Sequence, residues 1–195
     1  MAGAFLFIGA AQFLLCLVVG EALYSGYSVS SNYISELGVG STAILFNGSV
    51  FVLGVAVMAG AYLLRETCWY GVLPYLLMLC GVGCMGTAIF PYIYGMIHSL
   101  FALISFLFGA LATIVSCSFQ EAPMKHICVV LGAVSLMALV LFMVGEIYLR
   151  YCGILLNLGI GLGGMERLIV YPILIWALGF GGLLIGKKKQ EPDRN

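Results

Sequence analysis

The sequence predicts an all-α protein, an integral membrane bundle of six transmembrane helices. Hydrophobic residues make up 63% of its 195 positions. Charged residues make up only 8%, whereas soluble domains carry roughly 25%. Apolar runs of about 20 residues, the length that crosses a hydrocarbon core, recur six times along the chain. So few charges cannot cover a surface that faces water, and the apolar surface must therefore face lipid.

The apolar runs divide the chain into one transmembrane domain at residues 1–186 and a short basic cytoplasmic tail at 187–195. We expect the spans at residues 3–23, 42–64, 70–90, 98–118, 127–148 and 166–186. The first run is interpreted as a retained helix rather than a signal peptide, because no Lys or Arg precedes it and Glu21 makes a poor cleavage context. Pro74 and Pro172 are expected to bend the third and sixth helices.

Lys and Arg set the expected orientation, since cytoplasmic loops carry an excess of them. With the N-terminus inside, the inner segments hold Arg65, Lys125, Lys187, Lys188, Lys189 and Arg194. The outer loops then hold only Arg150 and Arg167. The sequence therefore predicts a multi-pass protein of the cell membrane with both termini in the cytoplasm. Zero net charge and the lack of a basic cluster outside the tail exclude nucleic acid as a partner.

With this orientation, polar residues gather at the outer face of the membrane. The group consists of Glu21, Asn32, Ser35, Glu36, Asn47, His98, Glu146, Asn157, Glu166 and Arg167. Several of them begin or end a predicted helix, where a side chain can turn into the bundle. Ionisable residues at membrane depth are costly, so a cluster of them indicates a functional site unless structural partners account for it.

Structural partners are available for some of the charged members. Glu146 and Arg150 are four apart with Glu first, the spacing and order of a stabilising pair on a helix surface. Arg167 stands outside against the orientation rule and needs a partner, for which Glu36 and Glu21 are the candidates. A structural ion pair and a ligand-binding group are equally open interpretations of Arg167.

The uncharged members also have structural interpretations. His98 at a helix start can anchor a loop by hydrogen bonding. Asn47 and the mid-helix Gln12 can hydrogen-bond a neighbouring helix or the outer loop. Cys80 and Cys84 share one helix face, but two thiols are too few for a metal site, and small packing residues are the preferred interpretation.

Three stretches of sequence, each followed by further matching residues, carry a resemblance to a known family. They are Tyr33 to Gly38 followed by Phe46 and Asn47, Gly86 to Pro91 followed by Ile97 to Ser99 and Ala102, and Gly164 to Arg167 followed by Pro172 and Trp176. Over nearly the whole chain, they resemble the prokaryotic six-helix membrane family called domain of unknown function 998. That family is distantly similar to the Frag, DRAM and Sfk membrane proteins, which include a eukaryotic factor in lipid remodelling of glycosylphosphatidylinositol anchors.

The resemblance implies no activity, but it implies which residues occupy motif positions. These are Ser35, Glu36, Asn47, His98, Glu166 and Arg167. They are members of the group that the topology places at the outer face, so two separate lines of reasoning select the same residues.

One function left open is an enzyme that acts on lipid at the outer face. His98 would be its general acid or base, and Glu36 or Glu166 its catalytic partner or a metal ligand. Arg167 would hold an anionic head group. Asn47 and Ser35 would complete a binding site for lipid or a small ligand. The sequence assigns neither a metal nor a cofactor.

Two other functions also remain open. The polar cluster could lock the outer loop onto the bundle of a non-catalytic protein, such as a lipid sensor or an assembly factor. A transporter or channel would need ionisable residues near mid-membrane, of which the sequence offers few. The expected partners are membrane lipids, with a second copy of the chain or another membrane protein as further possibilities.

Overall fold

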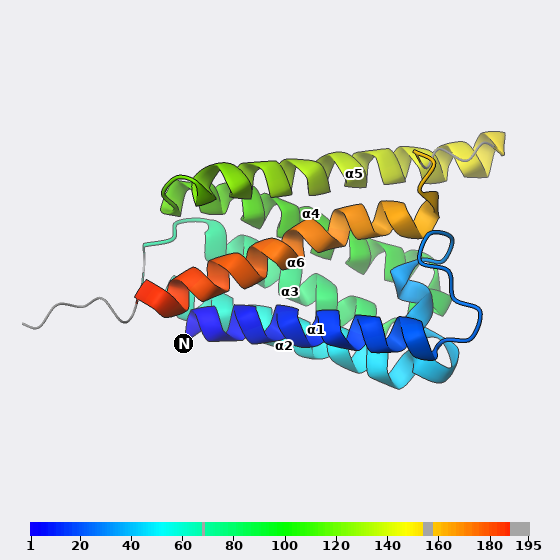
Figure 1. Ribbon diagram of the computed structural model, residues 1–195, viewed down its shortest axis with the longest axis horizontal. Coiled ribbons are helices and arrows are strands. Elements are labelled where there is room, and N and C mark those ends of the chain that lie inside the picture. Colours follow the sequence, from blue (N-terminus) through cyan, green and yellow to red (C-terminus); the bar gives the residue numbers. More distant parts are fainter. Residues whose placement is uncertain (68, 154–157, 188–195) are drawn as a thin grey trace, which may run out of the picture.

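The computed structural model describes residues 1–67, 69–153 and 158–187 (Figure 1). Asn157 and the tail residues Lys188, Lys189 and Arg194 lie outside the described residues. The described chain forms α-helices and short 3-10 helices and contains no strand. The α-helices are α1 (Ala2–Leu23), α2 (Ala43–Arg65), α3 (Leu73–Ile89), α4 (Met96–Val115), α5 (Met124–Cys152) and α6 (Gly161–Lys187). Each occupies one of the predicted spans.

Five of these helices are long and apolar enough to cross a membrane: α1, α2, α4, α5 and α6. α3 has 17 residues and is about 26 Å long, a little short of a hydrocarbon core of roughly 30 Å. Large apolar side chains stand exposed on the outside of the helices, among them Leu15, Val52, Leu100, Met137 and Ile175. The protein is therefore a helical bundle of the multi-pass membrane class.

The helices form a ring in chain order. Each helix packs against the next, and α6 closes the ring by packing against α1. Figure 1 shows that α1 begins and α6 ends at the same end of the bundle, which we call the terminal end. At the opposite end lies the connector segment, residues 24–42, which joins α1 to α2 and contains the 3-10 helices η1 (Ile34–Gly38) and η2 (Gly40–Thr42). We call this end the connector end.

Close approach of the helices depends on small residues and a few interhelical hydrogen bonds. A Cβ on Gly83 of α3 would come within 2.4 Å of the backbone nitrogen of Ser105 on α4. Gln12 Nε2 on α1 donates to the carbonyl of Ser49 on α2 at 2.9 Å, an interhelical bond of the kind expected from the sequence. Small residues and such bonds drive helix association in lipid, where apolar contact alone gives little advantage over contact with acyl chains.

The two helical prolines have different positions. Pro172 lies inside α6, whereas Pro74 lies in the first turn of α3. The first-turn amide groups of a helix have no partner within the helix, so a proline is tolerated there. Pro74 therefore starts α3, and the expectation that it bends the helix was wrong.

The contact at Gly83 can be tested by a single methyl group. Gly83→Ala should lower stability by about 1–3 kcal/mol, the usual cost of overpacking a filled interior. Gly182→Ala is the matched control, because a Cβ at Gly182 of α6 meets nothing within 4 Å. The measurement is the thermal midpoint of each purified variant in detergent. Equal midpoints for Gly83→Ala and the parent would contradict the close packing of α3 on α4.

Candidate functional site

The connector segment is folded around its own acidic residue. Glu36 Oε1 accepts the backbone N–H of Tyr33 at 3.0 Å, and Glu36 Oε2 accepts Nδ2 of Asn32 at 2.6 Å. Glu36 thus satisfies donors at the start of η1, the usual role of an acidic residue near a helix N-terminus. Its hydrogen bonds stay within the connector.

Asn47 ties the other end of the connector to α2. Its Nδ2 donates to the carbonyl of Gly38 at 2.9 Å. The approach is so close that a Cβ on Gly38 would lie 2.5 Å from Asn47 Oδ1. Thr42 Oγ1 closes the same turn by donating to the carbonyl of Leu37 at 2.8 Å. Asn47 therefore has a structural partner in the connector, one of the two kinds of partner that the sequence suggested.

Arg167 anchors the connector to the bundle. Its Nη2 lies 2.5 Å from Glu21 Oε1 of α1 and donates to the Tyr27 hydroxyl at 2.8 Å. Its Nη1 donates to the carbonyls of Val29 at 2.7 Å and Gly163 at 3.0 Å. Only 5% of the residue is exposed. Of the two candidate partners, Glu21 is the one that forms the ion pair.

Two tyrosines of the connector extend this network. The Tyr27 hydroxyl donates to the carbonyl of Tyr33 at 2.9 Å. Burial raises the pKa of Tyr27 to about 12, although the hydrogen bond from Arg167 acts in the opposite direction. The Tyr33 hydroxyl donates to Glu146 Oε1 of α5 at 2.5 Å, and burial together with this carboxylate raises the pKa of Tyr33. Both hydroxyls therefore keep their protons at neutral pH and serve as donors.

The bond from Tyr33 corrects the expected pairing of Glu146 with Arg150. In the described part of the chain, the ion pair formed is that of Arg167 with Glu21. Arg150 is exposed on the outside of α5. Glu146 instead accepts a hydrogen bond from the connector, because a partly buried phenol needs an acceptor more than a solvated guanidinium does. Local helix spacing alone did not reveal this competitor.

The start of α6 lies directly against the connector. The backbone N–H of Gly163 donates to the carbonyl of Ser30 at 2.9 Å. A Cβ on Gly163 would lie 2.1 Å from the carbonyl oxygen of Asn32. The connector carbonyl thus satisfies a first-turn amide of α6, which has no partner inside the helix. This contact explains why α6 begins at Gly161, before the predicted span at 166–186.

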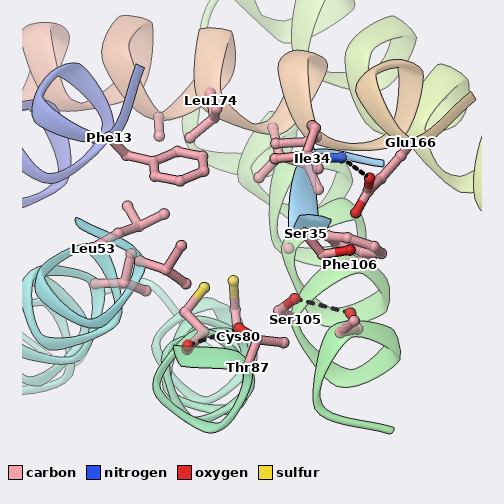
Figure 2. Close-up of a pocket in the computed structure, with 18 of the residues that line it drawn as sticks. Phe13, Ile34, Ser35, Leu53, Cys80, Thr87, Ser105, Phe106, Glu166 and Leu174 are labelled. Carbon is pink, nitrogen blue, oxygen red and sulfur yellow. Dashed lines mark hydrogen bonds between the residues drawn. The ribbon is translucent and has the colours of Figure 1, made fainter. Parts of the chain in front are cut away.

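Glu166 joins the connector to the interior of the bundle. Its Oε2 accepts the backbone N–H of Ile34 at 2.5 Å, and the backbone N–H of Ser35 lies beside the same carboxylate. Figure 2 shows the Glu166 side chain reaching from α6 past Ile34 toward Ser35. The residue is buried. Glu166 therefore stands where the connector meets the centre of the helix ring.

A central cavity of about 110 Å³ lies inside the ring. α1, α2, α3, α4, α6 and η1 line it, and α5 contributes none of its lining residues. Apolar side chains such as Phe13, Leu53 and Leu174 surround most of it (Figure 2). It is elongated along the bundle: Glu166 and Ala177, both lining residues of α6, are about 16 Å apart along that helix.

The polar groups of the lining divide into two kinds. Ser105 and Thr87 donate to carbonyls of their own helices, so their hydroxyl protons are already used. Ser35, His98 and Glu166 line the cavity at the connector end. The opposite end of the cavity is lined by apolar residues. The cavity is therefore apolar along its length and polar at one end.

His98 is held by the backbone groups of Phe90 and Thr87 rather than by a carboxylate. Its Nδ1 donates to the carbonyl of Phe90 at 2.8 Å, and the ring of Tyr92 packs edge-on against the imidazole. Within the described residues, no carboxylate forms a hydrogen bond with His98. The bond to Phe90 is the loop anchor that the sequence suggested as one interpretation. It also fixes the ring, so that in the neutral form Nε2 carries the lone pair.

The predicted site residues therefore separate into two groups. Ser35, His98 and Glu166 meet at the cavity. Glu36, Asn47 and Arg167 hold the connector and do not line the cavity. In the described ranges, no three His, Cys, Asp or Glu side chains are grouped so that they could hold a metal ion. Tyr27 was not selected from the sequence, and Tyr33 was named there only as the first residue of a stretch that resembles the family.

Comparison with models of known protein families identifies the family of this chain. The model of the family described as Protein of unknown function (DUF998) matches residues 7–182. The chain belongs to this family. The match includes α2 to α5, the connector and most of α1 and α6, so the connector and all of the cavity lining except Leu6 lie within the matched residues. No curated protein and no solved structure matches the chain.

The ion pair should decide whether the connector stays on the bundle of this DUF998 member. Glu21→Gln leaves the buried Arg167 without its counter-charge, a loss that typically costs about 3–5 kcal/mol. Hydrogen–deuterium exchange should then rise across residues 24–42. Glu66→Gln, at an exposed position at the terminal end of α2, is the control and should leave exchange there unchanged. Unaltered protection of residues 24–42 in Glu21→Gln would contradict the anchoring role.

Proposed function

We propose that this protein binds a single-chain membrane amphiphile, with the apolar chain along the central cavity and the polar group at the connector end. One observation carries the proposal: the cavity is elongated and apolar, and Ser35, His98 and Glu166 gather at one end of it. A molecule with a tail and a small head matches that distribution. Membrane lipids are therefore the partner class.

The energetics of the site differ from those of a soluble lipid carrier. A chain that enters from the bilayer leaves surroundings as apolar as the cavity, so the hydrophobic effect contributes little. Filling the cavity instead restores the dispersion contacts that its lining lacks when it is empty. Selection among ligands then depends on the polar end. The cavity supplies length and shape, and Ser35, His98 and Glu166 supply the chemistry.

The connector gives the site a cover. Ile34 and Ser35 belong both to the connector and to the cavity lining. Arg167, Glu36 and Asn47 hold this segment in place. The structural lock and the lipid site that the sequence offered as alternatives are thus parts of one arrangement in the proposal.

The enzyme and transport alternatives have less support. General acid–base catalysis by His98 would call for a carboxylate that orients its ring, and a backbone carbonyl takes that place. Transport would call for polar groups along a path across the bundle. The terminal end of the cavity is lined by Leu6, Val57 and Ala177, which provide none.

The proposal includes a topology of six spans in the cell membrane. In addition to the five long helices, α3 also crosses the membrane, although it is short. It packs along both α2 and α4, and the bilayer can thin around a short helix. Both termini are cytoplasmic, which follows from the excess of Lys and Arg on that side. The connector then faces the extracytoplasmic side.

Cysteine labelling tests this topology. In a variant whose native cysteines are replaced, we expect Ser28→Cys in the connector to react with a membrane-impermeant maleimide on intact cells. Lys188→Cys should react only after the membrane is permeabilised. Labelling of both positions from the same side would overturn the arrangement with six spans.

Occupancy of the cavity can be read from Trp176. This side chain lines the cavity and is 2% exposed, whereas Trp69, the other tryptophan, is 73% exposed. In a Trp69→Phe background, an amphiphile brominated at its chain end should quench Trp176 fluorescence, because only a chain inside the bundle can reach it. The protein is studied in an unbrominated, uncharged detergent.

A pair of valines on α2 supplies the matched variants for this experiment. Val50 lines the cavity, and Val52 is 51% exposed on the outside of the same helix. Val50→Phe fills part of the cavity and should weaken quenching by the brominated amphiphile at least tenfold in apparent affinity. Val52→Phe should leave it unchanged. Equal quenching of both variants would refute binding in the cavity.

A further inference from the structure

We infer that the polar group of the ligand is a hydrogen-bond donor without negative charge, a hydroxyl or an amine, and that the site rejects carboxylate and phosphate head groups. This inference rests on the proposed function, since it concerns the polar end of the same cavity. It reverses the expectation from the sequence, in which Arg167 holds an anionic head group.

The first step is that no cation is available at the cavity. Among the described residues that line it, there is no Lys or Arg. Arg167 is adjacent to Glu166 in the chain, but its guanidinium points to the connector. It is bound there by Glu21, Tyr27 and backbone carbonyls. An anionic head group would therefore meet no counter-charge.

The second step is that the backbone donors nearby are already used. The N–H groups of Ile34 and Ser35 at the start of η1 would suit an anion, since exposed amides at a helix start attract negative charge. They face the carboxylate of Glu166 instead. These two donors are therefore not available to a ligand.

The third step is that the remaining groups accept hydrogen bonds. Glu166 is a carboxylate, and in the neutral ring of His98 the lone pair lies on Nε2 because Nδ1 donates to Phe90. The Ser35 hydroxyl can also accept, and no hydrogen bond from it to a described residue is present. Three acceptors at the connector end of an apolar cavity match a head group that donates.

Electrostatics make the preference strong. An anionic head group beside Glu166, in surroundings with little water, would be desolvated without a counter-charge, and the ionised form of Glu166 would also repel it. A hydroxyl or an ammonium group also loses its water on entering the cavity, but it compensates for that loss by donating hydrogen bonds to the acceptors. We therefore expect at least a tenfold difference in apparent affinity between donor and anionic head groups on the same chain.

The test uses four probes with one chain, brominated at its end: an alcohol, a primary amine, a carboxylate and a phosphate monoester. Each is titrated into the Trp69→Phe protein in uncharged detergent, and quenching of Trp176 is measured. The alcohol and the amine should quench at concentrations at least tenfold lower than the two anions. This ranking is measured on the folded parent and does not depend on any site variant.

Glu166→Gln then tests the acceptor directly. The amide oxygen of Gln can still accept the N–H of Ile34, so the connector keeps its contact. The variant should lose any advantage of the amine over the alcohol and should bind the anions more tightly than the parent does. Glu66→Gln removes one negative charge at the terminal end and should leave the ranking unchanged.

The outcomes separate the two proposals. If no probe quenches Trp176, the amphiphile site itself is refuted. If the carboxylate or phosphate probe quenches as strongly as the alcohol, the site stands and the donor head group is refuted. An unchanged ranking in Glu166→Gln, with the protein folded, would remove Glu166 from the recognition.

Discussion

The guanidinium of Arg167 is the constraint on which the connector end depends. A cation in apolar surroundings must be enclosed by acceptors, because its desolvation is otherwise too costly. The acceptors come from α1, from the connector and from α6 itself. In meeting this need, the chain fixes the connector across the end of the ring. That placement brings Ile34 to Glu166 and Ser35 to the cavity.

The position of the helices could be predicted because long apolar runs leave little choice in a membrane. The partner of Arg167 was also within reach, since the predicted topology puts Glu21 at the same face. Helix ends were less accessible. α6 begins at Gly161 because Gly163 packs against the backbone of Asn32, a contact between segments far apart in the sequence.

The cavity could not be predicted at all from the sequence. It is a volume that side chains from five helices leave unfilled. The hydrophobic periodicity of a sequence predicts which residues face inward, but it does not predict where their packing leaves space. The same limit applies to the pairing of Glu146. Its neighbour at four positions was visible in the sequence, whereas the competing hydroxyl of Tyr33 arrives only when the connector folds onto α5. Residue type indicated which groups would gather, and packing decided which of them face inward.

Because α5 does not line the cavity, its packing constraints differ from those of the other five helices. Five helices must preserve the shape of a shared interior, whereas α5 contacts α4, α6, lipid and, through Glu146, the connector. It is held to α6 by the bond from Ser135 to the carbonyl of Ile169, and Gly132 lies so close to Ile114 of α4 that a Cβ would be 2.4 Å away. Away from such contacts, α5 can accept one lipid-facing residue for another without altering the interior. The ring thus contains one helix that takes no part in shaping the cavity, whereas the other five are constrained by the space that they enclose.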